Sequence, residues 1–382
     1  MTQYDPEALL QRIARLQSVG DAYFPAGLFP AYRHNPNWAY RRPDTNVFFT
    51  AVTVFTLQQL RPRLSVTAQL LVDQITERAL PTYDLFRNKD GLKTYNFYQT
   101  KPSRHFPHGW LMRHFDHFRI PDDIDDTAMV YLTSRPAPDD LRFLVEKLPQ
   151  HANGTRLLVR NTFPEYQTLR VYSTWFGKNM NIEFDACALS NLLYCLYEYD
   201  MPPSRYDADS LTFLRAIVES DRYRTDPFRC AHNYARTSLI IYHLSRLIGA
   251  FNPPALQPIL DKLYRDTQQA FETVTNRLDR ILLATSLLRL APLVGCSEQP
   301  DVPLAGIGRD FERFHFFIAG MLSAYEHRWV YSWAPHPFWH IRWQCEAHNW
   351  ALVLEYVCLR NGGPNGSVRT QDGDTAGAQT SL

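Results

Sequence analysis

The sequence predicts an all-α fold in a single domain, and three observations support this prediction. Apolar residues recur at the helical spacing of three to four positions in one segment after another. No run alternates apolar and polar residues convincingly, apart from short strand candidates at 93–99 and 155–160. Hydrophobic residues make up 45% of the chain and charged residues 21%, so a helical domain of this length can bury a substantial core.

About a dozen helices of 10 to 20 residues are expected from this spacing, joined by loops rich in Pro, Asp and Asn. Ser65 stands at the start of one of these runs, where a hydroxyl can cap the first turn. Pro254, Pro300 and Pro303 interrupt the later part of the chain and mark loops. The predicted helices cover residues 6–18, 45–60, 65–80, 124–133, 138–148, 184–199, 207–219, 230–249, 255–272, 275–292, 306–324 and 345–360.

Helices in this number are expected to pack as pairs in two concentric layers, which is a single (α/α)6 barrel over residues 1–360. No fixed repeat period is visible, and this argues against a helical solenoid. A barrel of this kind surrounds a central cavity, and the 14% aromatic content would suit its lining. From Asn361 to Leu382 apolar residues almost disappear, so a disordered tail is predicted over 361–382.

Charge and cysteine usage restrict the partners and the compartment. The formal net charge is only +1, so no nucleic-acid partner is expected. The six cysteines show no close pairing, which favours reduced thiols and a cytoplasmic location. No apolar run approaches the roughly 20 residues of a membrane span, so no transmembrane segment is expected. Peripheral association with a membrane surface stays open.

The segment Asp122-Asp123-Ile124-Asp125-Asp126 places four carboxylates in five positions directly before a helical run. One or two acidic residues are ordinary in a first turn, where they complement the helix dipole. Four such residues repel one another, so at least one should keep its proton to a higher pH than an isolated Asp. A carboxyl that stays protonated in an apolar pocket can act as a proton donor.

Asp123-Ile124-Asp125-Asp126-Thr127-Ala128 resembles the Asp-x-Asp-Asp-Thr-Ala motif of class II terpene cyclases of the squalene–hopene cyclase type. Segments that begin at Asp44, Phe184 and Cys345 resemble the inner-helix starts of the α-toroids in that family. The resemblance implies an α-toroid in which Asp125 protonates a terminal alkene or epoxide and Asp123 and Asp126 tune it. Aromatic faces would then stabilise the carbocation, and a positioned water or base would quench it.

The resemblance leads to an expected function in isoprenoid biosynthesis: cyclisation of a linear isoprenoid, initiated by protonation, by an enzyme of the isomerase or lyase type. The proton transfer itself needs no cofactor, whereas Mg²⁺ is expected only if the substrate carries a diphosphate. A single toroid leaves its mouth open to water, so a lid, a partner or a homodimer is expected to close it. The alternative is a toroid that binds an isoprenoid or a glycan without converting it.

Two metal-dependent interpretations stay open. Asp122-Asp123-x-x-Asp126 also fits the Mg²⁺-binding pattern of class I terpene synthases, but the second acidic motif of those enzymes is absent from the sequence. Asp185, Cys187 and His232 could supply a carboxylate, a thiolate and an imidazole to a zinc ion, as in protein prenyltransferase β subunits, which share the toroid.

Further candidates come from aromatic and basic residues. One of the four histidines 105, 108, 114 and 117 could hydrogen-bond a motif carboxylate, although surface positions are the simpler interpretation. The expected substrate-binding residues are Trp110, Tyr172, Trp175, Phe176 and Trp339, and the candidate phosphate-binding residues are Lys101, Arg113 and Lys178.

Overall fold

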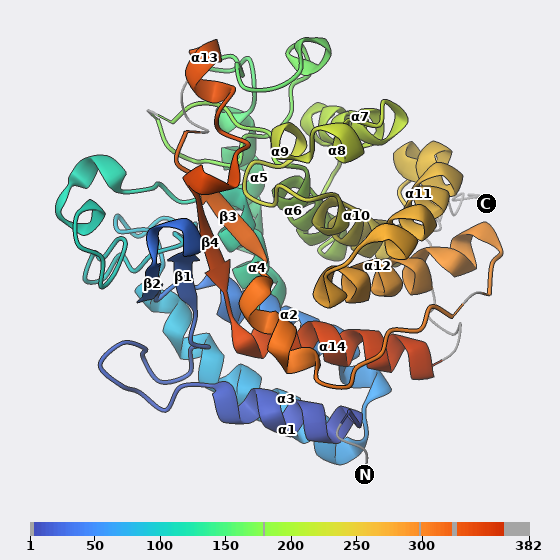
Figure 1. The fold of residues 1–382 in the computed structure, drawn as a ribbon. Helices are drawn as coiled ribbons and strands as arrows, with labels where there is room; N and C mark the ends of the chain where they lie inside the picture. The colour runs from blue at the N-terminus through green and yellow to red at the C-terminus, as the bar shows by residue number, and fades with distance from the viewer. Residues whose placement is uncertain (1–3, 179, 298, 323–326, 363–382) are drawn as a thin grey trace, which may run out of the picture.

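The computed structural model describes residues 4–178, 180–297, 299–322 and 327–362, and within these ranges the chain is mostly helical (Figure 1). Local capping explains several helix starts. Ser65 caps α3, Ser204 and Asp207 form a capping box at the start of α7, and Asn276 caps α12. The α-helices are α1 (Pro6–Leu16), α2 (Phe48–Leu60), α3 (Val66–Ala79), α4 (Ile124–Ser134), α5 (Pro138–Lys147), α6 (Ala186–Glu198), α7 (Arg205–Glu219), α8 (Arg222–Thr225), α9 (Pro227–Cys230), α10 (Thr237–Phe251), α11 (Leu260–Thr273), α12 (Arg277–Leu290), α13 (Arg328–Tyr331) and α14 (Glu346–Asn361).

Six of these helices form a closed cycle of contacts. In order, α2 packs against α4, α4 against α6, α6 against α10, α10 against α12, α12 against α14, and α14 against α2. Most residues of each of these helices are buried, and in α10 every residue from Ser238 to Ile248 is buried. We call these six the ring helices.

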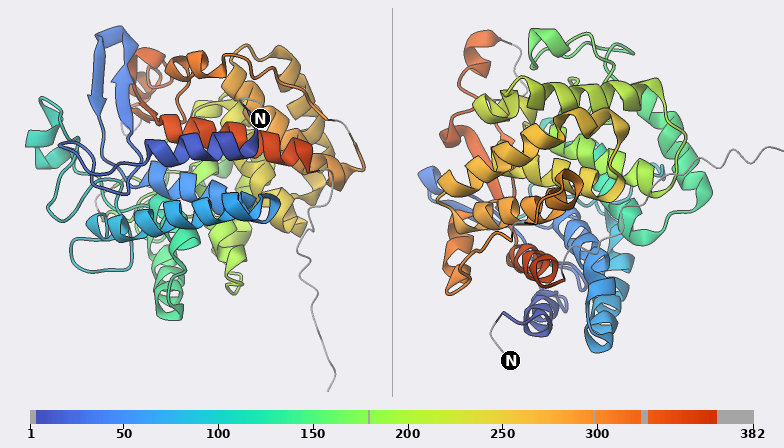
Figure 2. Two further views of the ribbon diagram at one scale, coloured as in Figure 1. Left: turned by 90° about the horizontal axis from the view of Figure 1, so that it is seen from below. Right: turned by 90° about the vertical axis from the view of Figure 1, so that its right-hand side faces the viewer.

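A second set of helices covers the ring helices from outside. Helix α1 packs against α14 and α3, α3 against α2, α7 against α6, and α11 against α12. Helices α1 and α11 are amphipathic and bury one face only, with Leu9, Leu10 and Ile13 as the buried residues of α1. Figure 2 shows α1 and α3 lying along the ring helices α14 and α2.

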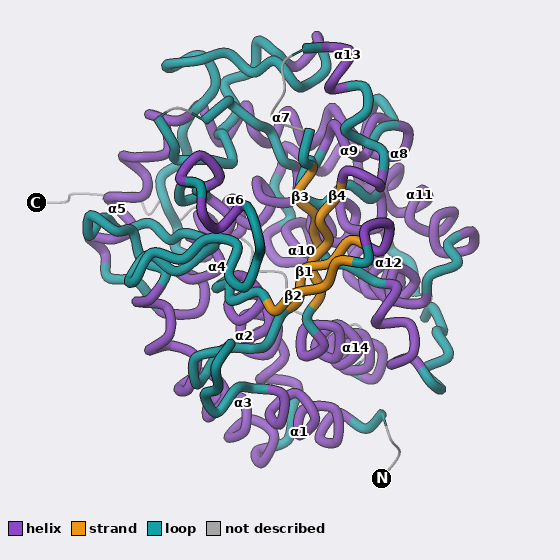
Figure 3. Tube along the Cα trace, turned by 60° about the vertical axis from the view of Figure 1, so that its left-hand side comes forward, coloured by secondary structure: helices purple, strands orange, loops and turns teal. Residues whose placement is uncertain are grey.

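A four-stranded antiparallel sheet accompanies the helices. Its strands are β1 (Tyr32–Asn35), β2 (Tyr40–Pro43), β3 (Phe317–Gly320) and β4 (His340–Gln344), in the order β2-β1-β4-β3. The register pairs Arg33 with Trp343 and Phe317 with Trp343, so strands from both ends of the chain are joined. Figure 3 shows the strands in front of the labelled ring helices.

A buried ion pair fixes this sheet to the ring helices. The Arg33 guanidinium on β1 forms a salt bridge with Asp44, and both side chains are fully buried. Asp44 precedes α2, and its second oxygen accepts a hydrogen bond from the Trp343 indole on β4 at 2.7 Å. Arg33 also donates to the Pro107 carbonyl at 2.8 Å. One polar centre therefore joins the sheet, the start of α2 and the loop after residue 100.

The predominantly helical prediction is confirmed, and every predicted run except one contains a helix of similar extent. The exception is 306–324, where a 3₁₀ turn at Ile307–Arg313 is followed by strand β3. The all-α prediction is therefore wrong in that it omitted the sheet. Residues 93–99 and 155–160 form no named strand, although Tyr95 and Tyr98 make isolated bridges.

Two further expectations concern the tail and membranes. Asn361 and Gly362 mark the end of α14, and the rest of the predicted tail, 363–382, lies outside the described residues. Across the described ranges, none of the helices combines the length and apolar character that a membrane span requires.

Candidate functional site

The acidic motif borders a cavity of about 210 Å³ at the amino-terminal ends of several ring helices. Phe48 is the first residue of α2, the motif carboxylates begin α4, Glu183 precedes α6, and Asn233 and Tyr234 precede α10. Strand β3 and Trp343 of β4 also line the cavity. The lining residues are Phe48, Phe97, Tyr98, Phe106, Ile120, Asp123, Asp125, Asp126, Thr174, Trp175, Met180, Glu183, Asn233, Tyr234, Phe317, Ile318, Ala319, Gly320 and Trp343. We call this space the acidic cavity.

Asp125 is held by side chains from two other ring segments. Asn191 on α6 donates its amide to Asp125 Oδ1 at 2.6 Å, and the Tyr234 hydroxyl donates to Oδ2 at 2.5 Å. Burial raises the pKa of Asp125, while the two hydrogen bonds and the nearby Arg246 charge oppose that rise. Asp125 is therefore a buried carboxyl whose ionised form has donors ready to stabilise it.

Arg246 supports the position of Asp125 through Asn191. Its guanidinium on α10 donates to the Asn191 side-chain oxygen, so Asn191 connects Arg246 to Asp125. The same guanidinium lies 5.1 Å from the ring centre of Phe55. Arg246 is buried, and its positive charge makes the ionised state of Asp125 more favourable.

Asp123 and Asp126 form a pair at the start of α4. Asp123 caps the helix by accepting the Asp126 backbone N–H at 2.7 Å. Burial and the neighbouring carboxylates raise the pKa of Asp126 well above its ordinary value, and its side-chain hydrogen bond to Asp123 raises it further. Burial raises the pKa of Asp123 to about 7, although the same hydrogen bond opposes that rise. Both carboxyls of this pair therefore favour the protonated form more than an isolated Asp does.

Asp122 turns away from the cavity and organises the loop over residues 86–96. Its carboxylate accepts from Asn88 Nδ2 at 2.6 Å, Thr94 Oγ1 at 2.5 Å and Asn96 Nδ2 at 3.3 Å. Asp122 therefore has a structural role, and it does not join Asp123 and Asp126 in the geometry that a Mg²⁺ site would need.

Glu183 is a buried carboxyl on the acidic cavity that the sequence did not reveal. Asn233 Nδ2 donates to its Oε1 at 3.1 Å, and the Trp175 indole also hydrogen-bonds it. Burial raises the pKa of Glu183 to about 7. Asn233 and Tyr234 are consecutive residues. The Asn233 side chain hydrogen-bonds Glu183, and the Tyr234 side chain hydrogen-bonds Asp125, so one short segment supports both carboxyls.

The predicted substrate-binding residues divide into two groups. Trp175 borders the acidic cavity, as do the motif residues Asp123, Asp125 and Asp126. Tyr172 is buried, and its hydroxyl bonds Ser204 and Asp207 instead. Phe176 packs against His151, and Trp110 is exposed on the surface.

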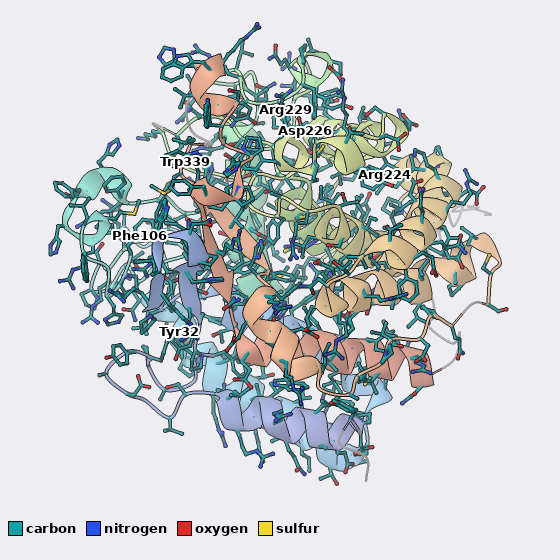
Figure 4. The ribbon with its side chains drawn as sticks, in the orientation of Figure 1. Tyr32, Phe106, Arg224, Asp226, Arg229 and Trp339 are labelled. Carbon is teal, nitrogen blue, oxygen red and sulfur yellow. The ribbon has the colours of Figure 1, made fainter. Side chains whose placement is uncertain are left out.

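Trp339 directly precedes β4 and packs beside Phe338 (Figure 4), and it is not among the residues that line the acidic cavity. The three candidate phosphate-binding residues also lie outside the lining. Lys101, Arg113 and Lys178 are all exposed.

The four histidines after residue 104 do not contact the motif carboxylates. His105 bonds the carbonyls of Met112 and Phe115, and His114 and His117 are exposed. Asn191 and Tyr234 occupy the places where a histidine was considered. Asn191 lies in the predicted helix over 184–199, and Tyr234 lies two residues after the candidate zinc ligand His232, so both stand near positions that the sequence indicated for other reasons.

The zinc alternative finds no cluster of ligands in the described part of the chain. Asp185 caps α6 by accepting from the backbone N–H groups of Cys187 and Ala188, and its other oxygen accepts from the Asn233 N–H. His232 bonds the Tyr331 hydroxyl at 2.7 Å. These side chains therefore serve as structural ties between α6, the segment before α10, and α13.

Comparison with known proteins identified no matching family model, no similar curated protein and no similar solved structure.

Proposed function

We propose that this chain is a class II terpene-cyclase-like enzyme that protonates a linear isoprenoid with Asp125 as general acid. One observation carries the proposal. Asp125 lines an aromatic cavity that the apolar residues of β3 also line, and its conjugate base is stabilised by Asn191, Tyr234 and Arg246. A surface helix cap would need neither the burial nor these donors. The aromatic lining is the environment that a carbocation requires.

The first step transfers the Asp125 proton to one carbon of a terminal C=C bond, or to the oxygen of an epoxide. In an alkene, the electron pair of the C=C bond forms the new C–H bond, and positive charge develops on the neighbouring carbon. In an epoxide, an oxygen lone pair forms the new O–H bond, and the C–O bond breaks with its electron pair on oxygen, so that positive charge develops on carbon. The next C=C bond of the chain attacks that carbon and closes a ring. Asp125 is left as a carboxylate, which Asn191 and Tyr234 stabilise by hydrogen bonds.

The last step needs a proton acceptor on the same cavity, and Glu183 suits that task. With a pKa of about 7, Glu183 is ionised in a substantial fraction of molecules at neutral pH. The C–H bond beside the final cation breaks, its electron pair forms a C=C bond, and the proton moves to Glu183. Exchange with water then returns a proton to Asp125, so the net reaction is an isomerisation.

The closed cycle of ring helices also supports a specific proposal for the fold, which is an (α/α)6 barrel. We infer that α2, α4, α6, α10, α12 and α14 are the inner layer of an (α/α)6 barrel, with α1, α3, α5, α7 and α11 in the outer layer. The 3₁₀ turn at Ile307–Arg313 packs against α12 where a sixth outer helix would lie. The amino-terminal ends of inner helices would then surround the acidic cavity, which is the arrangement that the motif resemblance implies.

The experiment is product analysis by gas chromatography and mass spectrometry. Wild type, Asp125→Asn and the exposed charge control Asp139→Asn are incubated with linear isoprenoids of increasing length, with and without a diphosphate, in Mg²⁺. We expect a cyclic product from wild type and from the control, and none from Asp125→Asn. A Glu183→Gln variant should still consume the substrate but shift the product toward water-quenched alcohols. Consumption by Asp125→Asn at the wild-type rate would overturn the proposal, as would no consumption by wild type.

A further inference from the structure

A second cavity, of about 330 Å³, adjoins the acidic cavity. Four residues line both spaces, so the segment before α10 and strand β3 form their shared border. These residues are Asn233, Tyr234, Phe317 and Ile318. The chemistry of the two cavities differs. The first gathers carboxyls, whereas the second gathers two arginines and two histidines: Arg236, Arg342, His315 and His340. We call the second space the basic cavity.

Arg342 on β4 is a cation without a counter-ion. Across the described residues, its side chain forms no ion pair, and its Nε is buried without a hydrogen-bond partner. Its neighbour across the sheet is His34 on β1, whose Nε2 is also buried without a partner. An unpaired guanidinium that is half-buried costs folding free energy, because neither water nor a carboxylate compensates it fully.

Arg236 lies in the same cavity in a fixed position. Its guanidinium donates to Asp279 Oδ2 at 2.8 Å and to the His315 carbonyl, and it stacks 4.8 Å from the ring centre of Phe314. These contacts leave its Nε buried and without a partner among the described residues. Arg236 also immediately precedes α10, so the first turn of a 15-residue helix opens on the same space.

The electrostatic surroundings of the cavity are positive. Burial and the Arg236 charge lower the pKa of Arg342. Burial, together with Arg236, Arg342, His34 and His340, lowers the pKa of His315 well below its ordinary value. Asp226 is the one carboxylate of the described lining, and Arg229 pairs with it at 3.6 Å (Figure 4). Asp279 forms a salt bridge with Arg236, so its negative charge does not compensate the positive charge of Arg342.

We propose that the basic cavity binds a phosphate or diphosphate group between Arg342 and Arg236. A dianionic group can accept from the terminal N–H groups of Arg342, whose side chain lines the cavity and has no hydrogen bond or ion pair among the described residues, and Arg236 adds a second positive charge to the same lining. Arginines are the side chains that suit phosphate oxygens best. The inference rests on the geometry of this cavity and holds whether or not the acidic cavity performs a cyclisation. If the cyclase proposal also holds, a phosphorylated isoprenoid would place its anionic end here and its chain beside Asp125.

The test measures binding of inorganic diphosphate, and separately of inorganic phosphate, to the intact protein by isothermal titration calorimetry. It compares wild type with Arg342→Gln and with the matched control Arg142→Gln. Arg142 is exposed on α5 and pairs with Asp139, so its replacement removes the same charge far from the cavity. We expect wild type and the control to bind diphosphate alike, and Arg342→Gln to lose affinity by roughly tenfold or more.

A second readout separates a binding role from a folding role. Without anion, Arg342→Gln should melt at the same temperature as wild type or higher, because it removes an uncompensated charge. With diphosphate, only wild type and the control should gain thermal stability. Equal affinity of wild type and Arg342→Gln would overturn the proposal, as would no binding by wild type at millimolar diphosphate.

A final comparison identifies the source of the phosphate. Wild type and Arg342→Gln are titrated with a prenyl diphosphate and with the corresponding prenyl alcohol. If the diphosphate binds more tightly to wild type by roughly tenfold or more, and this preference disappears in Arg342→Gln, the anion is the end of the substrate itself. If the two prenyl compounds bind equally while inorganic diphosphate still requires Arg342, the cavity holds a separate phosphate ligand. Because no turnover is needed, failure of the cyclase assay leaves this result interpretable.

Discussion

Asp125 and Asp126 are adjacent carboxyls on one cavity, yet they are suited to different tasks. Asp125 has two donors on its oxygens and Arg246 behind them, so it can leave a stable carboxylate. Asp126 has a buried oxygen without a partner among the described residues, and its pKa lies well above the ordinary value. An acid that cannot stabilise its conjugate base is a poor donor, so Asp126 is expected to keep its proton.

The first prediction follows from this contrast. We expect Asp125→Asn to lower the single-turnover rate of cyclisation by roughly a hundredfold or more, and Asp126→Asn by about tenfold or less. Rapid-quench kinetics on the best substrate of the product screen would measure both rates. Circular dichroism serves as the folding control, because asparagine fits either site. The reverse order of the two effects would make Asp126 the acid.

The second prediction concerns Glu183 and pH. Below about pH 4.5 the carboxyl is protonated in both the folded and the unfolded chain, so it does not alter the free energy of unfolding. As the pH rises toward 7, the unfolded chain releases this proton while the folded chain keeps it. Glu183 therefore destabilises the fold progressively between pH 4.5 and 7, and by a constant amount above that range.

Replacement of Glu183 by Gln removes this titration but keeps an acceptor for the Asn233 amide. The variant should match wild type near pH 4.5 and exceed its unfolding free energy at pH 8, by on the order of 1 to 3 kcal/mol. Urea unfolding at the two pH values measures the difference, and the buried histidines cancel because both proteins contain them. A difference that is the same at both pH values would contradict the assigned pKa.

At the residue scale the sequence predicted part of the site. The six-residue motif located Asp123, Asp125 and Asp126, because three acidic residues in a helix start are a local signal. Glu183, Asn191 and Tyr234 reach the same cavity from α6 and the segment before α10. Their convergence depends on how the ring helices pack, and no spacing within one sequence encodes it. The aromatic candidates could not be told apart from sequence for the same reason: Trp110 and Trp175 are equally aromatic, but of these two only Trp175 lines the cavity.

At the scale of elements, the buried pair of Arg33 and Asp44 is expected to control how the sheet joins the ring helices. Arg33→Met leaves the Asp44 charge buried without its cationic partner, which should lower the unfolding free energy by about 3–5 kcal/mol. The double variant Arg33→Met, Asp44→Asn should lose less than the sum of the two single changes. Urea denaturation of the four proteins provides the cycle.

The control for this cycle is Arg61→Met. Arg61 and Asp73 form a salt bridge in which both side chains are about 40% exposed. Because this pair is exposed to solvent, its loss should have little effect on the unfolding free energy. Equal costs for the buried and the exposed pair would mean that Arg33 contributes only packing, and the sheet would then be held by other contacts.

Helices were easier to predict than strands because their signals are local. Ser65 and the apolar spacing after it suffice to place α3. Strand β3 is only four residues long, and Phe317 and Ile318 are both buried, so its pattern matches a buried helix equally well. Its partner β4 and the strand β1 beyond it are distant in sequence, with His34 paired to Arg342. The sheet therefore depends on long-range pairing that periodicity does not report.

At the scale of the whole molecule, the described fold leaves an apolar loop exposed. The loop over residues 104–119 carries Trp110, Leu111 and Phe115, which are 81%, 65% and 50% exposed. Phe106, near the start of this loop, and Ile120, directly after it, line the acidic cavity. Arginines at 104 and 113 lie among these side chains. Exposed aromatic and aliphatic side chains beside basic residues are typical of surfaces that enter the interface of an anionic membrane.

The last prediction is that this loop brings the protein to lipid vesicles. Wild type should float with vesicles that contain phosphatidylserine. The partition coefficient of the triple variant Trp110→Ser, Leu111→Ser, Phe115→Ser onto these vesicles should be lower by roughly tenfold or more. Val66→Ser, Leu70→Ser is the matched control, because these α3 side chains are 74% and 58% exposed and belong to another part of the surface. Sedimentation velocity on the same proteins separates the alternative. If wild type ignores vesicles but forms a dimer that the triple variant loses, the loop is a protein interface that covers the cavity. If neither assay responds to the triple variant, the loop neither binds lipid nor closes the cavity, and another segment must shield Asp125 from water.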